Sequence, residues 1–232
     1  GVQISGGGSL EIRRSEISDN QGTGVLAFGA GGVQIIDPSY IVDPAYQPRP
    51  LDGSEVGIVD PAYQLANSMS INNNRGGGVA IIDPSYSPTG KADELSAPDL
   101  EISGALLQAN YLFGVAVFGG SVKLKSAAIL LTRIEASGDL ADGVVLAPGQ
   151  GAKAAVDAEI DGGCVVARND RMGLLVASSG VTTSRTEVAA DVSRNMKGGA
   201  WLQGPGATLD LVAGARLSAN SLIGVAVTGG SR

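Results

Sequence analysis

Three short motifs in the first part of the chain place an acid, a proline and a tyrosine in the same order. Their aspartates are 23 residues apart each time, and the motifs are Ile36-Asp37-Pro38-Ser39-Tyr40, Val59-Asp60-Pro61-Ala62-Tyr63 and Ile82-Asp83-Pro84-Ser85-Tyr86. If the motifs stack, their carboxylates could hold Ca²⁺ through oxygen ligands, and their tyrosine rings could stack on sugars. The same residues also suit plain turns, because Asp bonds the backbone two residues on and Pro ends a strand. Ligand binding and turn formation are therefore alternatives for this group.

A second group of candidates is basic, with cations placed one residue before and two residues after each of two asparagines. The four cations are Arg168, Arg171, Arg194 and Lys197. Clustered cations of this kind bind carboxylate or sulfate groups, arginine in a bidentate manner. The alternative is a solvated corner whose charges pair with neighbouring acids. Trp201 is the sole tryptophan, and its place in the alternation points it outward, either as a sugar platform or partly covered by a corner loop.

A repeated motif predicts the elements that position these residues. Each copy has an aliphatic residue, an asparagine three positions later, a glycine four positions after the asparagine, and a second aliphatic residue directly after the glycine. The asparagines of six copies are Asn20, Asn74, Asn110, Asn169, Asn195 and Asn220. A degenerate seventh copy reads Ala136/Asp139/Gly143/Val144. From Asn74 onward the motifs are 25 to 36 residues apart, which suits one coil of a solenoid and is too short for a domain.

Each repeat predicts about three short strands separated by glycine corners. Parallel strands of successive coils pair at ~4.8 Å, and alternate side chains point inward, so Val79, Val115, Leu174 and Val225 should form one inner row. Glycine suits corners because it accepts positive φ. Asparagine tolerates the left-handed conformation, and its amide can bond the equivalent amide one coil away, so we expect an internal asparagine ladder rather than a binding array.

The Asn-x-x-x-Gly-Val-x-Val units and their glycine corners resemble those of secreted bacterial right-handed parallel β-helix proteins of the pectin-lyase-like superfold. The resemblance covers nearly the whole chain. It implies an all-β, single-stranded right-handed parallel β-helix (solenoid), here of about nine coils, with loop excursions near 41–55 and 87–98. It says little about activity, because that superfold hosts lyases, hydrolases, epimerases and non-catalytic surface proteins. Its uronic-acid lyases use Arg or Lys as the base with acids and Ca²⁺, but no acidic cluster here is visibly in register with the cations.

Composition excludes several kinds of function. The chain has 232 residues with 35 glycines, a net charge of −7, one cysteine and no histidine. The acidic balance argues against binding to nucleic acid and against docking on an anionic membrane. The lack of histidine excludes Ser-His-Asp triads and His-ligated metal sites. Cys164 sits beside strand residues and suits a small core filler, and no apolar run approaches the ~20 residues needed to cross a bilayer.

We expect residues 1–232 to form one domain, a segment of a longer chain, because the sequence opens and closes inside a repeat. The expected function is that of a non-catalytic extracellular or cell-surface module with a structural, adhesion or recognition role. The alternative is a lyase or epimerase acting on an acidic polysaccharide. No cofactor is required, although Ca²⁺ is an option. Expected partners are a polysaccharide or another surface protein, with end-to-end or flanking-domain contacts at the terminal coils.

Overall fold

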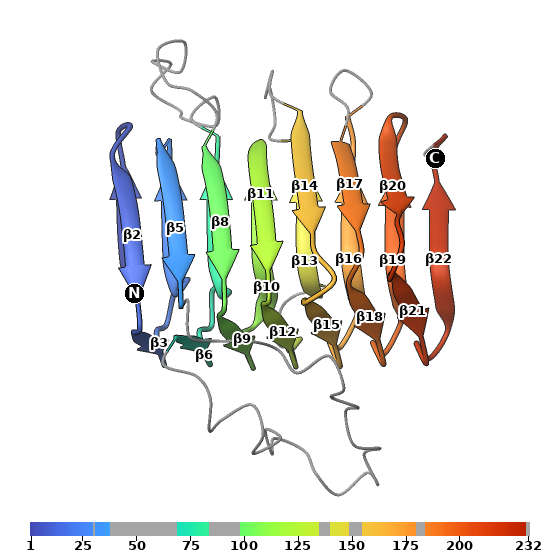
Figure 1. Cartoon of the computed structure of the whole chain (residues 1–232), viewed down its shortest axis with the longest axis horizontal. Helices are drawn as coiled ribbons and strands as arrows, with labels where there is room; N and C mark the ends of the chain where they lie inside the picture. Colours follow the sequence, from blue (N-terminus) through green and yellow to red (C-terminus); the bar gives the residue numbers. More distant parts are fainter. Residues whose placement is uncertain are drawn as a thin grey trace, which may run out of the picture.

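The chain folds into stacked parallel strands with no helix in the part that is described. The computed structural model describes residues 1–29, 31–37, 69–83, 98–134, 140–148, 155–179 and 184–230. These ranges contain 22 strands, and none of their segments is a helix long and apolar enough to cross a membrane. Figure 1 shows the strands side by side along the long axis of the molecule, from β2 near the N-terminal end to β22 at the C-terminal end.

Every third strand belongs to the same sheet, which gives three sheets. Sheet A has eight strands: β1 (Val2–Ser5), β4 (Val25–Phe28), β7 (Val79–Ile82), β10 (Leu112–Phe118), β13 (Ala141–Ala147), β16 (Met172–Ala177), β19 (Gly198–Gln203) and β22 (Ile223–Thr228). Sheet B has seven: β2 (Ser9–Arg13), β5 (Gly32–Ile36), β8 (Asp99–Ser103), β11 (Gly120–Lys125), β14 (Val156–Ile160), β17 (Ser184–Val188) and β20 (Ala207–Leu211). Sheet C also has seven: β3 (Glu16–Ser18), β6 (Ser70–Asn72), β9 (Leu106–Gln108), β12 (Ala128–Leu130), β15 (Val165–Ala167), β18 (Asp191–Ser193) and β21 (Arg216–Ser218).

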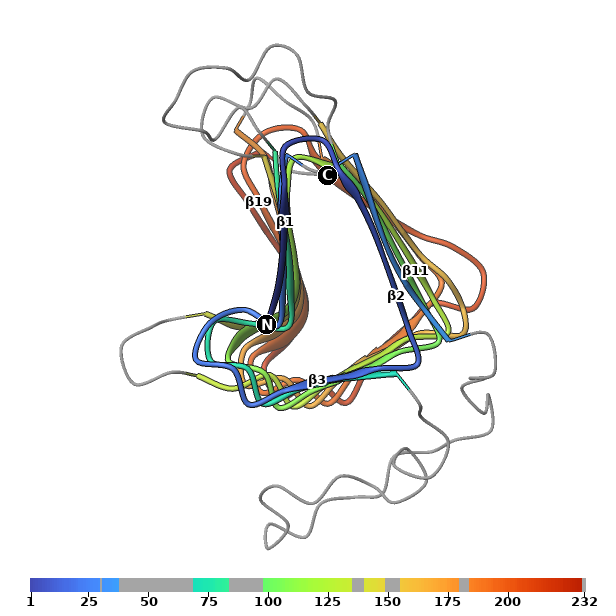
Figure 2. The same cartoon turned by 90° about the vertical axis from the view of Figure 1, so that its left-hand side faces the viewer.

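The three sheets enclose a tube of roughly triangular section (Figure 2), and the fold is the predicted right-handed parallel β-helix. Sheets B and C each contribute seven strands and sheet A eight, so the described residues form seven complete coils and the first strand of an eighth. The predicted count of about nine coils refers to the whole chain, part of which lies outside the described residues. The excursions predicted near 41–55 and 87–98 lie outside the described residues, apart from Pro98.

The inside of the tube is filled by aliphatic columns that run from coil to coil. One column in sheet A contains Val25, Val79, Val115, Val144, Leu174, Ala200 and Val225. Its members are fully buried except Val225, which is 40% exposed because no described coil follows it. The predicted inner row is thus present. Each buried aliphatic side chain contributes about 1.5–3 kcal/mol relative to an exposed one, so stacking coils stabilise one another through these columns.

The corner between sheets C and A contains hydrogen-bonded asparagines. Amide nitrogen Nδ2 donates to Oδ1 of the next asparagine from Asn20 to Asn74 (2.7 Å) and from Asn74 to Asn110 (2.9 Å). The same bond runs from Asn169 to Asn195 (2.8 Å) and from Asn195 to Asn220 (3.0 Å). The expected hydrogen bonds between these side chains are therefore present. The left-handed residue, however, precedes each asparagine, for example Asp19 with φ 58° and Arg168 with φ 59°.

The ladder is interrupted at the end of the fourth coil, after β12, where the sequence placed the degenerate motif wrongly. Ile129 of β12 pairs with Leu107 and Val166, so it occupies the aliphatic position that the sequence assigned to Ala136. Three residues later, buried Thr132 takes the asparagine position, and its backbone N–H donates to Asn169 Oδ1 at 3.0 Å. An insertion before Gly143 shifts the apparent spacing, while Asp139 itself lies outside the described residues.

A column of glycines follows the asparagines because neighbouring coils approach each other closely there. A Cβ atom on Gly24, Gly78 or Gly173 would lie 2.9, 2.3 or 2.8 Å from the carbonyl oxygen of the glycine one coil further on. Real Cβ contacts are never that short, so any other residue would push the coils apart. The glycine in the repeated motif is therefore a packing requirement of the stack rather than a requirement for positive φ.

The equal spacing of the Asp-Pro motifs does not reflect stacking. Asp37 follows β5 of sheet B, and its backbone N–H donates to the Ser103 carbonyl oxygen. Asp83 follows β7 of sheet A, and its backbone N–H donates to the Phe118 carbonyl oxygen. The two aspartates lie on different sheets, so the predicted acidic column is wrong for this pair. Asp60 and the tyrosines Tyr40, Tyr63 and Tyr86 lie outside the described residues. The strand that matches the later copies is β4, because Val25 pairs with Val79, while Val33 belongs to sheet B.

Candidate binding face on sheet B

The outer face of sheet B carries two rows of polar side chains along the tube. Alternation places every second residue outward, and the parallel register aligns these residues from strand to strand. The first row is Ser9, Gly32, Asp99, Ser121, Asp157, Arg185 and Thr208. The second row is Glu11, Gln34, Glu101, Lys123, Glu159, Glu187 and Asp210.

The outward residues of the other two sheets are mostly apolar in their central coils. On sheet A the outward row includes Ala80, Ala116, Val145 and Leu175, which form a small buried cluster with Phe113. On sheet C a second buried cluster lies outside the tube and consists of Leu106, Ala128, Leu130, Val165 and Ala167. Sheet B is therefore the sheet whose described outer face offers a continuous polar surface.

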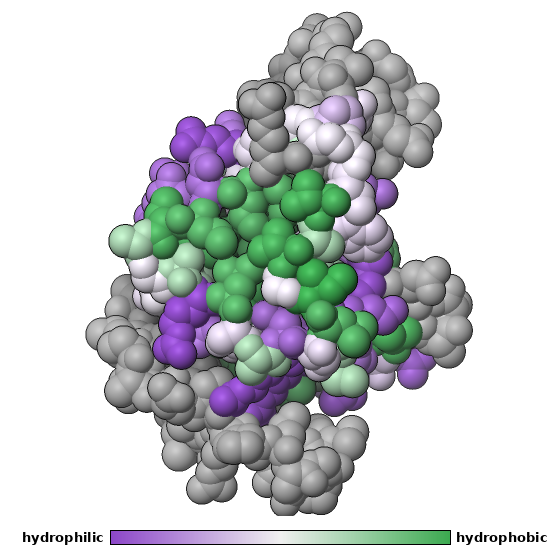
Figure 3. Space-filling model, turned by 90° about the vertical axis from the view of Figure 1, so that its right-hand side faces the viewer, coloured by the Kyte–Doolittle hydropathy of each residue, from purple (hydrophilic) through white to green (hydrophobic). Residues whose placement is uncertain are grey.

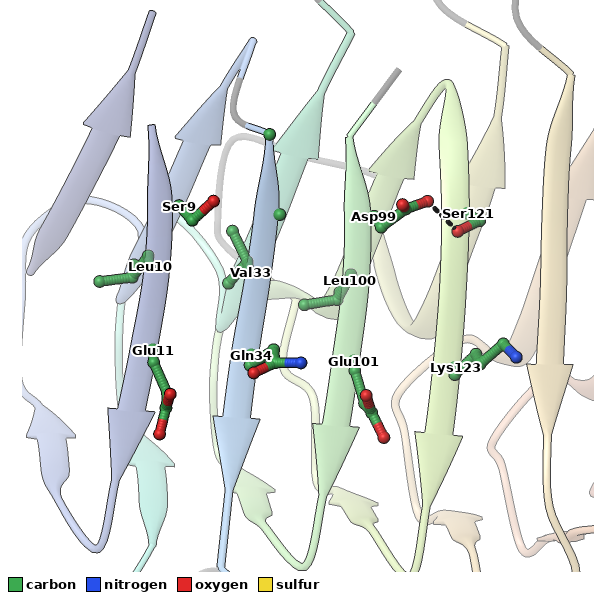
Figure 4. A pocket seen from close by; sticks show the side chains of 12 residues that line it. Ser9, Leu10, Glu11, Val33, Gln34, Asp99, Leu100, Glu101, Ser121 and Lys123 are labelled. Atoms are coloured by element: carbon green, nitrogen blue, oxygen red, sulfur yellow. Dashed lines mark hydrogen bonds between the residues drawn. The ribbon is translucent and has the colours of Figure 1, made fainter. Parts of the chain in front are cut away.

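A depression of about 640 Å³ lies on this face over the first four strands of sheet B. Gly32 lies in it, and a Cβ atom added there would meet only the Asp99 carbonyl oxygen, at 4.0 Å. Figure 4 shows Ser9, Asp99 and Ser121 on one side of the gap, and Glu11, Gln34, Glu101 and Lys123 along the other. The missing side chain in the first row thus leaves a hollow between two sets of hydrogen-bonding groups.

Ion pairs and hydrogen bonds between neighbouring strands hold several of these side chains. Ser121 bonds to Asp99, and Lys123 Nζ lies 3.5 Å from Glu159 Oε2. Lys125, one outward position further along β11, donates to Glu101 Oε1 at 3.0 Å. This hydrogen bond, together with the charge of Glu101, raises the pKa of the Lys125 ammonium above its usual value. The exposed side chains are therefore partly ordered before any ligand arrives.

A second depression of about 290 Å³ continues along the same face and shares Ser121 and Lys123 with the first. Its further lining includes Asp157, Arg185 and Glu187. The two rows together hold seven carboxylates but only two cations. The face is thus acidic, and it offers alternating acceptors and donors to an extended ligand. No group of three acidic, Cys or His side chains in the described ranges is arranged to hold a metal.

Arg168 and Arg194 of the predicted basic corner occupy equivalent positions, and Arg171 beside them is paired with a buried acid. Arg168 and Arg194 occupy equivalent left-handed positions, with φ of 59° and 58°. Arg171 is joined to Lys197 by a backbone hydrogen bond of 2.9 Å. The Arg171 guanidinium donates to the buried carboxylate of Asp142, through Nε at 2.8 Å and also through a terminal nitrogen. Of the two alternatives for the basic corner, Arg171 fits the one in which the cations pair with neighbouring acids. The Arg171–Asp142 pair is, however, buried rather than solvated.

Trp201 points outward as predicted, since Ala200 and Leu202 on either side of it are buried. Its indole nitrogen donates to Thr228 Oγ1 at 3.1 Å. The guanidinium carbon of Arg171 lies 5.7 Å from the ring centroid, within the range of a cation–π contact. The ring is partly buried against the sheet A cluster. Trp201 thus lies beside the Asp142–Arg171 pair and on a different sheet from the polar face.

The residues of the sheet B depression were missed by sequence reasoning, although a signal was present. The signal is the alternation of apolar and polar residues in Leu10-Glu11-Ile12 and Val122-Lys123-Leu124, which is typical of a strand with one polar face. The sequence alone does not give the strand register, and it is this register that places Glu11 and Lys123 in one row. Comparisons of the chain with protein-family models, curated proteins and solved structures found no match.

Proposed function

We propose that this chain is a non-catalytic recognition module that binds a hydroxyl-rich polymer, a polysaccharide, along the outer face of sheet B. The observation that carries the proposal is the hollow at Gly32, which is bordered on both sides by hydrogen-bonding side chains of adjacent strands. Carboxylates accept hydrogen bonds from sugar hydroxyls, while serine and glutamine side chains both donate and accept. A rigid tube holds these groups at fixed positions, which lowers the ordering cost of binding.

The regular strand spacing favours an extended ligand over a compact one. Equivalent outward positions recur about every 4.8 Å along the tube axis, and the two depressions share Ser121 and Lys123. A polymer that follows the axis can therefore meet similar groups repeatedly. Because carboxylates outnumber cations on this face, a neutral or amino-bearing polysaccharide fits better than an acidic one, which would be repelled at low salt.

We further propose an extracellular or cell-surface location and a kinship with the secreted bacterial β-helix proteins of the pectin-lyase-like superfold. The asparagine ladder and the glycine column support the kinship. The location rests on the proposed ligand, since polysaccharides of this kind lie outside cells.

The experiment compares the wild-type chain with Gly32→Phe in affinity electrophoresis through a neutral β-glucan, chitosan or pectate. Gly32 does not need positive φ, and its side-chain position is open, so phenylalanine should fill the hollow without unfolding the coil. Gly22→Phe is the matched control, because a Cβ atom at Gly22, in the corner between sheets C and A, meets nothing within 4 Å and no positive φ is required there. Retardation by the glucan or by chitosan should fall at least about tenfold for Gly32→Phe and stay unchanged for Gly22→Phe. Equal retardation of wild type and Gly32→Phe would overturn the proposal.

An enzyme acting on a polysaccharide is the second candidate, and one observation favours it. The first depression is lined by Glu11, Glu101 and Lys123 on strands β2, β8 and β11 of one β-face. Carboxylates and lysine are the residue types that a lyase or epimerase uses as acid and base. Incubation with pectate and alginate, with and without Ca²⁺, tests this through the ultraviolet absorbance of unsaturated uronates. A signal lost in Lys123→Met would support a lyase, and an epimerase would instead change the uronate composition that NMR measures.

A further inference from the structure

Carboxylates on the outer face of sheet B alternate from strand to strand over the first five coils. Strands β2, β8 and β14 carry them in the two outward rows, whereas β5 and β11 carry none there. The carboxylates are those of Glu11, Asp99, Glu101, Asp157 and Glu159. The interior of the tube is apolar, as its end-on view shows (Figure 3), so a polar ligand meets only the outer faces. A ligand that follows the tube axis on sheet B therefore meets acids once in every two coils, about 9.6 Å apart.

Most of the acids that line the two depressions are already paired with cations of the same sheet. The pairs are Glu11–Arg13, Glu101–Lys125, Glu159–Lys123 and Glu187–Arg185. Asp99 and Asp157 differ, because neither belongs to an ion pair among the described residues. Asp99 accepts a hydrogen bond from Ser121. Arg185, the cation beside Asp157, donates to Asp210 instead, at 3.0 Å. Two carboxylates without a cation thus remain in the lining.

Asp99 and Asp157 lie in one row, on either side of Ser121. Asp99 lines the first depression and Asp157 the second, while Ser121 lines both. Figure 4 shows Asp99 and Ser121 next to each other at the edge of the hollow. Both aspartates are exposed. A ligand that lies along the row can therefore contact both carboxylates at once, across two strand spacings.

This spacing selects among polysaccharides. In an extended β-1,4-linked chain each sugar is turned by half a turn relative to the one before, so the same substituent returns on the same side with every second sugar. The distance between such substituents is the length of one disaccharide, which is close to two strand spacings. An ammonium group in that position forms a charge-assisted hydrogen bond with a carboxylate, and this bond is stronger than that of a neutral hydroxyl.

We propose, building on the proposed function, that the ligand of sheet B is a β-1,4-linked amino polysaccharide. The ammonium groups of two sugars in alternate positions bind Asp99 and Asp157, and the sugar between them lies over Ser121. Gly32, which precedes Asp99 in the same row, leaves room for a further sugar because its side-chain position is open. A neutral polymer of the same linkage fits the hollow equally well but has no cation for the two carboxylates.

Three hexasaccharides with the same β-1,4 backbone test the charge. Calorimetric titration at low salt compares hexamers of glucosamine, N-acetylglucosamine and glucose, which differ only at C2. The glucosamine hexamer should bind at least about tenfold more tightly than the other two, and the difference should shrink at high salt. Equal binding of the three hexamers, lost in Gly32→Phe, would overturn the amino preference and leave the proposed function standing. No binding of any hexamer, or equal binding by wild type and Gly32→Phe, would overturn both.

Variants of the two aspartates test the contacts. Asp99→Asn and Asp157→Asn should each weaken binding of the glucosamine hexamer about tenfold and change binding of the glucose hexamer by less than about twofold. Glu16→Gln is the matched control, because its carboxylate is exposed on β3 of sheet C and its loss changes the net charge equally. An equal loss of affinity in Glu16→Gln would show that net charge, rather than the two contacts, attracts the ligand, and would overturn the proposal.

The length of the oligosaccharide tests the spacing. A glucosamine trimer can reach both aspartates, whereas a dimer can reach only one at a time. Each single variant should therefore weaken trimer binding about tenfold, but dimer binding no more than about twofold, because the other aspartate remains. A dimer that is as sensitive as the trimer to Asp99→Asn would contradict simultaneous contact with both carboxylates.

Discussion

Arg171 donates from Nε to Asp142 Oδ1 at 2.8 Å and joins two neighbouring coils at the start of β13 and β16. The carboxylate is fully buried, and it also accepts the backbone N–H of Met172 at 3.1 Å. Burial raises the pKa of the Asp142 carboxyl above its usual value, and the hydrogen bonds from Arg171 oppose that rise. Arg171 is thus the main positive charge that balances this buried acid, with a smaller contribution from Lys197.

Replacement of that arginine should therefore be costly. We predict that Arg171→Met lowers the free energy of unfolding by about 3–5 kcal/mol, because it leaves an uncompensated buried carboxylate. Without Arg171 the folded state holds a proton on Asp142 that the unfolded chain releases above its ordinary pKa of 3.8. The variant should therefore lose stability as pH rises from about 4 towards the raised pKa, more steeply than wild type. Urea unfolding at several pH values measures both effects.

The double variant Asp142→Asn/Arg171→Met provides the control. It removes both charges, so most of the lost stability should return, and the dependence on pH should disappear. A double variant as unstable as Arg171→Met would show that packing of the arginine stem, rather than the charge, was lost. The same measurement reports on Trp201, whose fluorescence should respond in both variants because Arg171 lies over its ring.

Repeat motifs made most of the fold predictable from the sequence. Asparagine, glycine and the following aliphatic residue are each required by a contact with the next coil, so they recur wherever coils stack. The inner column and the ladder bonds follow directly from this requirement. The predicted column of aspartates was wrong because no contact between coils requires the 23-residue spacing. Asp37 and Asp83 are equally spaced from Asp60 in sequence but follow strands of different sheets.

The candidate face was harder to predict because its residues share no motif. Ser9, Gly32 and Asp99 belong to three different strands, and only the register places them in one row. A single-sequence pattern shows that each strand alternates, but it does not show which outward residues face each other. Asp142 was missed for a related reason, because it precedes Gly143 inside a coil whose motif is shifted by an insertion.

The interrupted ladder offers a stabilising substitution. Thr132 occupies the asparagine position of its coil and is buried. We predict that Thr132→Asn raises the free energy of unfolding by about 1 kcal/mol, because its side-chain oxygen can accept a hydrogen bond from Asn110. Chemical denaturation measures the change. Asn169→Ala, which removes an existing rung, should have the opposite sign, and destabilisation by Thr132→Asn would mean that this corner has no room for an amide.

Cys164 offers an internal reporter of unfolding. Burial raises the pKa of its thiol well above the usual value, and Sγ lies 3.4 Å from the Asp161 carboxylate and 3.5 Å from the Ala127 nitrogen. Because the thiolate is the reactive form, we expect no reaction with a thiol reagent such as DTNB near neutral pH. One equivalent should react once urea unfolds the coil. Stoichiometric labelling of the native protein at the rate of a free thiol would contradict the observed burial.

Replacing a glycine by alanine should destabilise the fold where two coils approach closely and should have little effect where the glycine is open. A Cβ atom at Gly173 would lie 2.4 Å from Val192 Cγ1 and 2.8 Å from the Gly199 carbonyl oxygen. Neither neighbour can retreat, because both belong to the next packed coil. We predict that Gly173→Ala lowers the free energy of unfolding by about 3 kcal/mol or more. Gly22→Ala meets no atom within 4 Å, and it should be neutral or slightly stabilising, since alanine restricts the unfolded chain. Thermal unfolding followed by circular dichroism tests both, and equal melting temperatures for the two variants would contradict the close approach of the coils.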